Sequence, residues 1–335
     1  KILYQIEKEM EAGIWGISTA LEYPPCSYCD VEEIAKSCKI VKKFNGIYST
    51  HMRNENGRKV FTSLEEAIKV AQISEVNLEI AHLKVAGKEG WGKAPEILNR
   101  IHQERKRGIE INADQYPYPA WGSSILDFLP KEMVYKGINY WRNYLLEKEN
   151  RKEIIHFIKN NLDGPEKGMG WEGIIIADTK TKNNEVIVGK SIHELSIIRK
   201  IEPEELIIDL LIEKEGYVKL IIFCMKEEDI KTIMKDSLVM IGSDGRAVSP
   251  YGKFANTHPH PRYYGTYPRI LGRYVREEKV ISLSEAIRKM TYMPATKIGL
   301  KDRGQITEGA FADIVIFNPQ TVIDNATFKN PHCFS

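Results

Sequence analysis

Two histidines, His51 and His82, stand 31 residues apart, and each one follows a short strand-like run. Thr19 and Asp114 repeat this interval on either side, and each closes another such run. Because a strand, a helix and their loops take roughly 30 residues, the spacing predicts consecutive βα units of a barrel. Barrel catalytic groups sit at the carboxyl ends of strands, so both imidazoles could reach one mouth. Imidazole is a common zinc ligand, so the pair points to metal-assisted hydrolysis. The alternative is two ordinary polar residues at strand ends.

Further residues could complete such a site. Asp244 follows an apolar strand and precedes a glycine. It could ligate a metal or move a proton, or it could cap a turn. Lys84 and Arg262 could grip a substrate carboxylate, the arginine with its two-pronged guanidinium, or could be surface charges. Tyr116 could line the pocket or pack at the barrel rim.

Two other groups have metal-binding patterns and a more ordinary explanation. His258 and His260 form an H-x-H, but prolines flank His260, which favours a rigid loop over a metal pair. Cys26 and Cys29 form a C-x-x-C without a second pair, so a zinc knuckle is not expected.

Alternating elements must position these residues. Asp30 is an expected helix N-cap, and Pro95 and Gly108 bracket another helix. Alternating strands and helices predict a parallel α/β sheet. The expected strands are 14–20, 47–50, 76–82, 109–114 and 238–245, and the expected helices are 1–12, 31–44, 64–72 and 95–107.

The later part of the chain is less regular. Residues 125–235 resemble an insertion, with expected helices near 141–160 and 203–214 and expected strands at 174–178 and 218–224. We expect a partial barrel domain over 1–303. A short strand at 311–317 predicts that 304–335 returns into a small β-rich domain.

Composition excludes several classes of protein. The chain has 335 residues, 42% of them hydrophobic and 28% charged, which is typical of a soluble globular protein. A formal net charge of +2 gives no case for nucleic acid or an anionic membrane as partner. No apolar run reaches the roughly 20 residues of a spanning helix. Five scattered cysteines and no secretory signal favour the cytoplasm.

Longer motifs resemble one family. In order along the chain, they resemble the N-acyl-D-amino-acid deacylase (D-aminoacylase) family of metal-dependent amidohydrolases. The motifs are E-Y-P-P at 22–25, S-T-H-M-R at 49–53, H-L-K-V-A-G at 82–87, A-D-Q-Y-P-Y at 113–118, I-G-S-D-G at 241–245, H-P-R at 260–262, Y-G-T-Y-P-R at 264–269 and R-K-M-T at 288–291. The closing G-A-F-A-D-I-V-I-F at 309–317 resembles the return of that superfamily into its small β-sandwich.

The resemblance implies a (βα)₈ TIM barrel with zinc at its carboxyl-end mouth. It implies His51 and His82 as zinc ligands and Asp244 as general acid/base. The implied reaction is hydrolysis of an N-acyl-D-amino acid, a small-molecule substrate, to a carboxylate and a free D-amino acid. The implied substrate-binding residues are Lys84 and Arg262 for the carboxylate, and Tyr23 and Tyr116 for the amide.

The resemblance also shows a departure. The family carries an H-x-H near its first barrel strand and a cysteine ligand soon after, and the matching region would precede Lys1. The chain therefore looks N-terminally truncated, and this exact span is predicted to be poorly soluble or inactive alone. A cyclic-amide hydrolase of the hydantoinase or dihydroorotase type and a degenerate, non-catalytic barrel stay open as alternatives.

Overall fold

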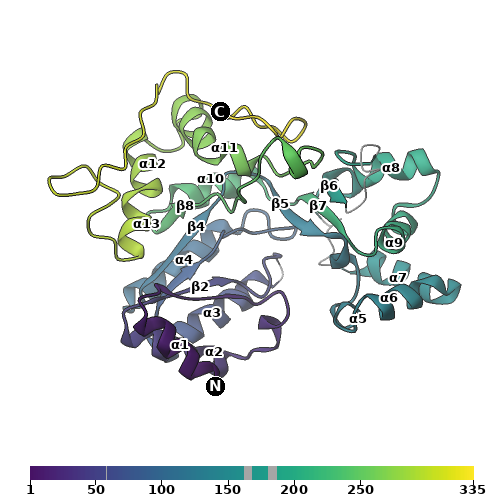
Figure 1. Cartoon of the computed structure of the whole chain (residues 1–335), viewed down its shortest axis with the longest axis horizontal. Coiled ribbons are helices and arrows are strands. Elements are labelled where there is room, and N and C mark those ends of the chain that lie inside the picture. The colour runs from purple at the N-terminus through teal and green to yellow at the C-terminus, as the bar shows by residue number, and fades with distance from the viewer. Residues whose placement is uncertain (58, 162–167, 180–186) are drawn as a thin grey trace.

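A parallel sheet forms the part of the molecule that carries the chemistry. The computed structural model describes residues 1–57, 59–161, 168–179 and 187–335. Five strands run parallel in the order β1-β2-β3-β4-β8 (Figure 1). They are β1 (Gly16–Ala20), β2 (Ile47–His51), β3 (Asn77–Ile80), β4 (Ile111–Gln115) and β8 (Val239–Ile241). All five strands predicted for this sheet are present.

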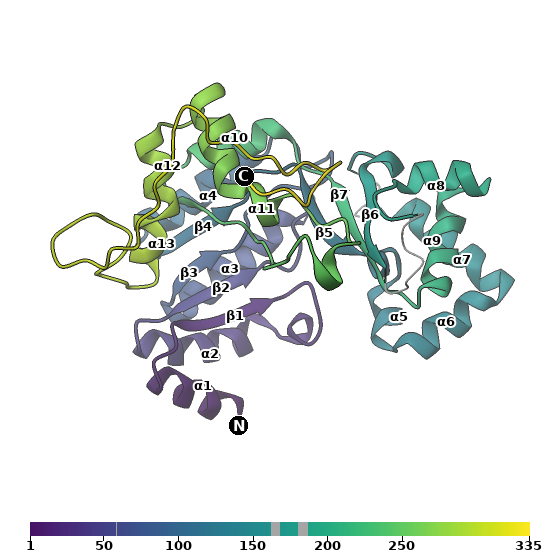
Figure 2. The same cartoon turned by 45° about the horizontal axis from the view of Figure 1, so that its top comes forward.

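Helices cover the outer face of this sheet. In α2, Asp30 accepts a hydrogen bond from the Glu33 N–H at 2.8 Å, as its predicted N-cap role requires. The buried stripe of α2, including Ile34, Cys38 and Val41, then packs toward the strands. The helices of this layer are α1 (Ile2–Glu11), α2 (Val31–Lys43), α3 (Val60–Ser74), α4 (Ala94–Lys106) and α10 (Glu227–Lys235). Figure 2 shows α1 and α2 beneath β1 and β2.

A second, antiparallel sheet occupies the region predicted as irregular. Its strands are β5 (Ala120–Ser124), β6 (Ile174–Thr179) and β7 (Val218–Phe223), in the order β5-β7-β6. The expected strands 174–178 and 218–224 are therefore confirmed, and β5 is an addition. The helices beside them are α5 (Lys131–Tyr135), α6 (Ile138–Leu146), α7 (Lys148–Asn160), α8 (Ile192–Arg199) and α9 (Pro203–Glu213). The single helix expected near 141–160 is two helices, because the backbone is extended at Glu147.

The C-terminal helices pack back onto the parallel sheet. They are α11 (Arg262–Arg269), a π-helical segment (Ile270–Glu277), α12 (Leu283–Met290) and α13 (Tyr292–Lys297). Short 3₁₀ turns complete the described elements: Cys26–Tyr28, Ile125–Phe128, Trp171–Gly173 and Gly252–Phe254. No helix in the described part of the chain is long and apolar enough to cross a membrane.

The strand predicted at 311–317 is wrong. These residues form no strand, and Val315 and Ile316 are 83% and 93% exposed. A strand is stabilised by hydrogen bonds to a neighbouring strand, and no strand within the described residues pairs with this segment. The assignment of 304–335 to a small β-sandwich stays a prediction.

Candidate metal centre

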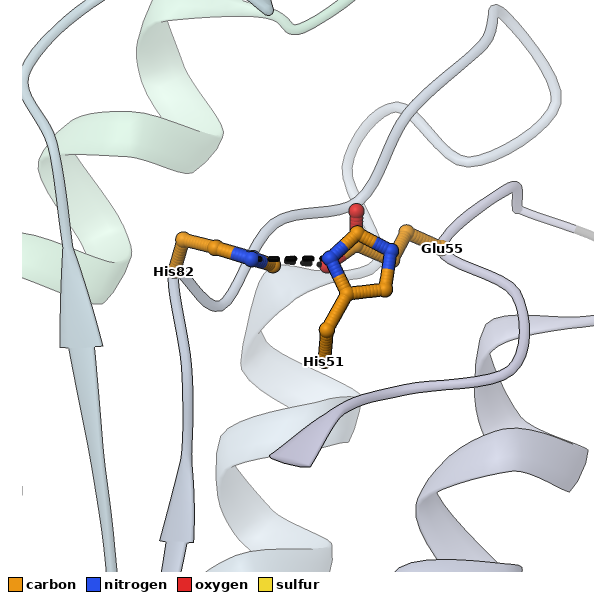
Figure 3. A group of neighbouring side chains, drawn as sticks. All are labelled: His51, Glu55 and His82. Atoms are coloured by element: carbon orange, nitrogen blue, oxygen red, sulfur yellow. Dashed lines mark hydrogen bonds and ion pairs between the residues drawn. The ribbon is translucent and has the colours of Figure 1, made fainter. Parts of the chain in front are cut away.

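His51 and His82 lie side by side at the ends of neighbouring strands. His51 is the last residue of β2, and His82 follows β3, which pairs with β2 in parallel with Thr50 opposite Ile80. The Nδ1 atom of His51 lies 2.9 Å from Nε2 of His82 (Figure 3). The spacing in the sequence thus brings the two rings together as predicted.

The backbone of His82 is held in an unusual conformation. Its φ is +41°, in the left-handed region that side chains with a Cβ rarely adopt. Asp114, at the end of β4, accepts the His82 backbone N–H on its Oδ1 at 2.9 Å. A Cβ at position 242 would lie 2.9 Å from the same oxygen, which accounts for Gly242. Asp114 was predicted to close its strand, and here it also anchors a candidate ligand.

Each imidazole has a carboxylate on the nitrogen that faces away from the other ring. Glu22 Oε2 lies 3.0 Å from His51 Nε2, and Glu55 Oε1 lies 3.0 Å from His82 Nδ1. A carboxylate fixes the N–H on the nitrogen it contacts, which leaves the other nitrogen with a lone pair. The two lone pairs then face each other, and a cation placed between them would satisfy both. Their separation is close to the roughly 3.3 Å expected for two nitrogens on one tetrahedral zinc. The residues fit a zinc ion.

Glu55 also ties a lysine to this pair. Its Oε2 accepts from Lys84 Nζ at 2.6 Å, and Nζ lies 2.7 Å from His82 Nδ1. Burial would raise the pKa of Glu55, but the positive charge of Lys84 and the hydrogen bond from His82 outweigh it and hold that pKa well below its ordinary value. Glu55 is therefore a carboxylate at neutral pH, and its ligand atoms, with those of His51 and His82, lie within 4.8 Å of one another.

A cationic cluster, centred on Arg262 and Lys84, lies next to the histidine pair. Arg262 Nη2 lies 2.9 Å from Asp244 Oδ2, and its guanidinium stacks 4.6 Å from the centre of the Tyr116 ring. The Lys84 ammonium is 5.6 Å from the centre of that ring. The buried Nε and Nη1 of Arg262 and the Tyr116 hydroxyl have no hydrogen-bond partner among the described residues. Buried polar groups are normally paired, so this cluster is suited to an anionic ligand.

Asp244 and Tyr23 border the same region. Asp244 and His82 both line an open pocket of about 720 Å³. The Tyr23 ring centre is 5.5 Å from that of His51. Burial, together with the charge of Glu22, raises the pKa of the Tyr23 hydroxyl. All seven predicted site residues thus gather around the carboxyl ends of the parallel strands.

The other candidate motifs are structural. His260 Nε2 lies 2.8 Å from the Ala120 carbonyl, and burial lowers the pKa of this ring far below its ordinary value. His258 contacts the Phe328 carbonyl at 2.5 Å. Cys26 and Cys29 are free thiols outside the histidine cluster. Among the described residues, the cluster that could hold a metal contains none of these four.

Sequence reasoning missed Glu22 and Glu55. Both lie in irregular loops, beyond β1 and β2, where no periodicity predicts the direction of a side chain. Glu22 belongs to the E-Y-P-P motif, which was the one available signal. Glu55 has no comparable signal, because its role depends on contacts with His82 and Lys84.

Known proteins are similar to this chain in sequence and in fold. The model of an amidohydrolase family matches residues 211–334. A D-aminoacylase of Alcaligenes xylosoxydans xylosoxydans is 32% identical over 97% of this chain and 56% of its own length. An N-acyl-D-glutamate deacylase of the same organism is 29% identical over 96% of this chain and 55% of its own length. The chain thus spans about half the length of these curated relatives.

Solved structures agree. The crystal structure of the N-acyl-D-glutamate deacylase of Bordetella bronchiseptica, with zinc and a phosphonate mimic of the tetrahedral intermediate, matches with a TM-score of 0.78. It is 25% identical, and the match covers 99% of this chain and 59% of that one. A D-aminoacylase structure, 28% identical, matches with a TM-score of 0.74 over 98% of this chain and 59% of its own.

Parallel strands that end in paired histidines, beside a carboxylate and a cationic cluster, are the architecture of the metal-dependent amidohydrolases. Within that class, the chain is similar to D-aminoacylase and to N-acyl-D-glutamate deacylase. The predicted fold class is confirmed, since the parallel sheet is part of an amidohydrolase-type TIM barrel.

Proposed function

We propose that this chain carries the catalytic face of a zinc-dependent N-acyl-D-amino-acid deacylase. The reaction is hydrolysis of a linear amide to a carboxylate and a free D-amino acid. One observation carries the proposal: His51 Nδ1 and His82 Nε2 face each other at 2.9 Å, while carboxylates occupy their outer nitrogens. The names of the relatives, D-aminoacylase and N-acyl-D-glutamate deacylase, support this substrate class.

His51 and His82 hold the zinc ion in this proposal. Zinc bound there supplies Lewis-acid polarisation of a carbonyl and makes a water more acidic. Glu22 and Glu55 keep both rings in the tautomer that turns a lone pair toward the metal. Because the directions of both rings are already fixed, less conformational entropy is lost when the substrate binds.

The cationic cluster binds the free carboxylate of the substrate. Arg262 offers the unpaired N–H groups of its buried Nε and Nη1, and the Tyr116 hydroxyl is an additional donor. The Lys84 ammonium adds a second positive charge, 5.6 Å from the centre of the Tyr116 ring. Tyr23 lies against His51 and positions the amide. A substrate held at its carboxylate presents its amide bond to the histidine pair.

Asp244 carries the proton. Its carboxylate lies on the pocket that His82 also lines and is held by Arg262 at 2.9 Å. It takes a proton from the attacking water and returns it to the leaving nitrogen, so its charge is restored at the end of each turnover. We place the enzyme in the cytoplasm, with small-molecule N-acyl amino acids as its partners.

A substrate panel tests the proposal. The purified product of the gene that encodes this chain, loaded with zinc, is assayed for amine release from N-acetyl-D-methionine, N-acetyl-L-methionine and N-acetyl-D-glutamate. Hydantoin and dihydrouracil test for ring opening. We expect amine release from at least one D substrate, much slower release from the L substrate, and no ring opening. Ring opening alone would establish the cyclic-amide alternative, and bound zinc without any turnover would establish a non-catalytic barrel.

A further inference from the structure

Glu55 contacts both halves of the proposed site. It is 6% exposed, and its two oxygens have different partners: Oε1 lies 3.0 Å from His82 Nδ1, and Oε2 lies 2.6 Å from Lys84 Nζ. We propose that Glu55 is a positioning residue that couples the metal site to the binding of the substrate carboxylate. This inference rests on the proposed function and adds a residue that the sequence did not reveal.

The proton on His82 is the physical basis of the coupling. Lys84 Nζ lies 2.7 Å from His82 Nδ1, so two arrangements compete. In one, Nδ1 carries the proton and donates to Glu55, and Nε2 keeps its lone pair. In the other, Lys84 donates to Nδ1, and the proton moves to Nε2, which then cannot bind a metal.

Glu55 decides between these arrangements. A buried carboxylate accepts one charge-assisted hydrogen bond on each oxygen, so it satisfies the imidazole N–H and the ammonium together. Without that charge, the ammonium turns to the nearest acceptor, His82 Nδ1. Loss of Glu55 therefore weakens metal binding through Lys84, and not only through a missing contact with His82.

Glutamine at position 55 is the sharpest substitution, because it keeps the size of the side chain. Its amide oxygen can accept from His82 or from Lys84, but its NH₂ group must then face the other donor. Glu55→Gln is expected to weaken zinc binding by about 10- to 100-fold, the usual effect of losing a carboxylate partner of a metal-binding histidine. It is also expected to raise KM several-fold, since Lys84 loses its anchor.

The distinguishing prediction is a rescue. Lys84→Met alone should leave zinc affinity within about threefold of wild type and raise KM, because Glu55 still accepts the His82 N–H. The double variant Glu55→Gln, Lys84→Met should regain most of the lost zinc affinity, since the competing donor is gone. A purely structural role for Glu55 predicts additive losses instead.

Zinc affinity is measured by competition with a chromophoric chelator, using the gene product stripped of metal. Glu96→Gln, an exposed glutamate on α4, is the matched control and should bind zinc like wild type. A Glu55→Gln affinity equal to wild type, or a double variant no tighter than Glu55→Gln, would overturn the coupling. Failure of the wild-type protein to bind zinc would instead overturn the proposed function, so the two failures are distinguishable.

Discussion

At the scale of single residues, the site depends on backbone placement as much as on ring chemistry. His82 reaches its partner only because its backbone turns into the left-handed region directly beyond β3. The Asp114 carboxylate stabilises this conformation by accepting a hydrogen bond from the His82 backbone N–H. The strand-end interval predicts where His82 lies, while the turn and its anchor emerge only from the folded chain.

Asp114→Ala is therefore expected to weaken zinc affinity by about tenfold, because the His82 ring loses its fixed direction. Asp114→Asn is the matched control, since its amide oxygen can accept the same N–H and should keep affinity near wild type. Chelator competition measures both. Equal affinity for Asp114→Ala and wild type would contradict the role of this anchor.

Asp127, in the 3₁₀ turn after β5, gives a pH-dependent prediction. Burial, with a contribution from Glu22, raises the pKa of Asp127 from 3.8 to about 6, although a Ser123 hydrogen bond opposes the shift. Between these two values the folded state binds more protons than the unfolded state, so the carboxyl group lowers the free energy of unfolding as pH rises.

Asp127→Asn removes this ionisation. The variant should match wild type near pH 4 and gain up to about 3 kcal/mol over it by pH 7, from roughly 1.4 kcal/mol for each pKa unit. Urea unfolding at several pH values measures the difference, and exposed Asp302→Asn controls for the loss of one negative charge. A difference that stays constant with pH would show that Asp127 titrates normally.

At the scale of elements, two lysines fasten the C-terminal helices to the parallel sheet. Lys289 of α12 is fully buried, and its Nζ donates to the Val239 carbonyl at 2.7 Å. Lys297 of α13 donates to the Leu78 carbonyl at 2.7 Å, and burial lowers its pKa to about 8. Nothing in the sequence predicts that a lysine would lie on the inner face of α12.

Lys289→Met keeps the length of the side chain and removes the donor. It leaves buried carbonyl groups at the start of β8 unpaired, so we expect a loss of about 2 kcal/mol in the free energy of unfolding. Arg288→Ala is the control: Arg288 pairs with Glu285 near the surface and should cost less than about 1 kcal/mol. Chemical denaturation of both variants decides, and equal losses would contradict the fastening role.

The elements also show where sequence reasoning stops. Local signals predict α2 and the strands β1 to β4, because caps and alternating apolar residues act within a few positions. Ile221 of β7 pairs with Ile175 and Gly122, which lie 46 and 99 residues earlier in the sequence, so this antiparallel pairing could not be predicted. The segment 311–317 has a strand-like sequence but no partner strand among the described residues.

At the scale of the whole molecule, the C-terminal helices connect the ends of separate strands of the parallel sheet. Arg262 begins α11 and reaches both Asp244 beyond β8 and Tyr116 beyond β4. The C-terminal segment runs back along α11 toward β5 and β7 (Figure 2), and Phe328 packs on Phe223 with ring centres 4.5 Å apart.

The location of zinc tests the central claim most directly. Crystals of the zinc-loaded gene product, measured at the zinc absorption edge, would give an anomalous map. We predict a zinc peak bonded to His51 Nδ1 and His82 Nε2, with Glu22 and Glu55 still on the outer nitrogens. A peak elsewhere, or zinc bound through His51 Nε2 or His82 Nδ1, would contradict the account.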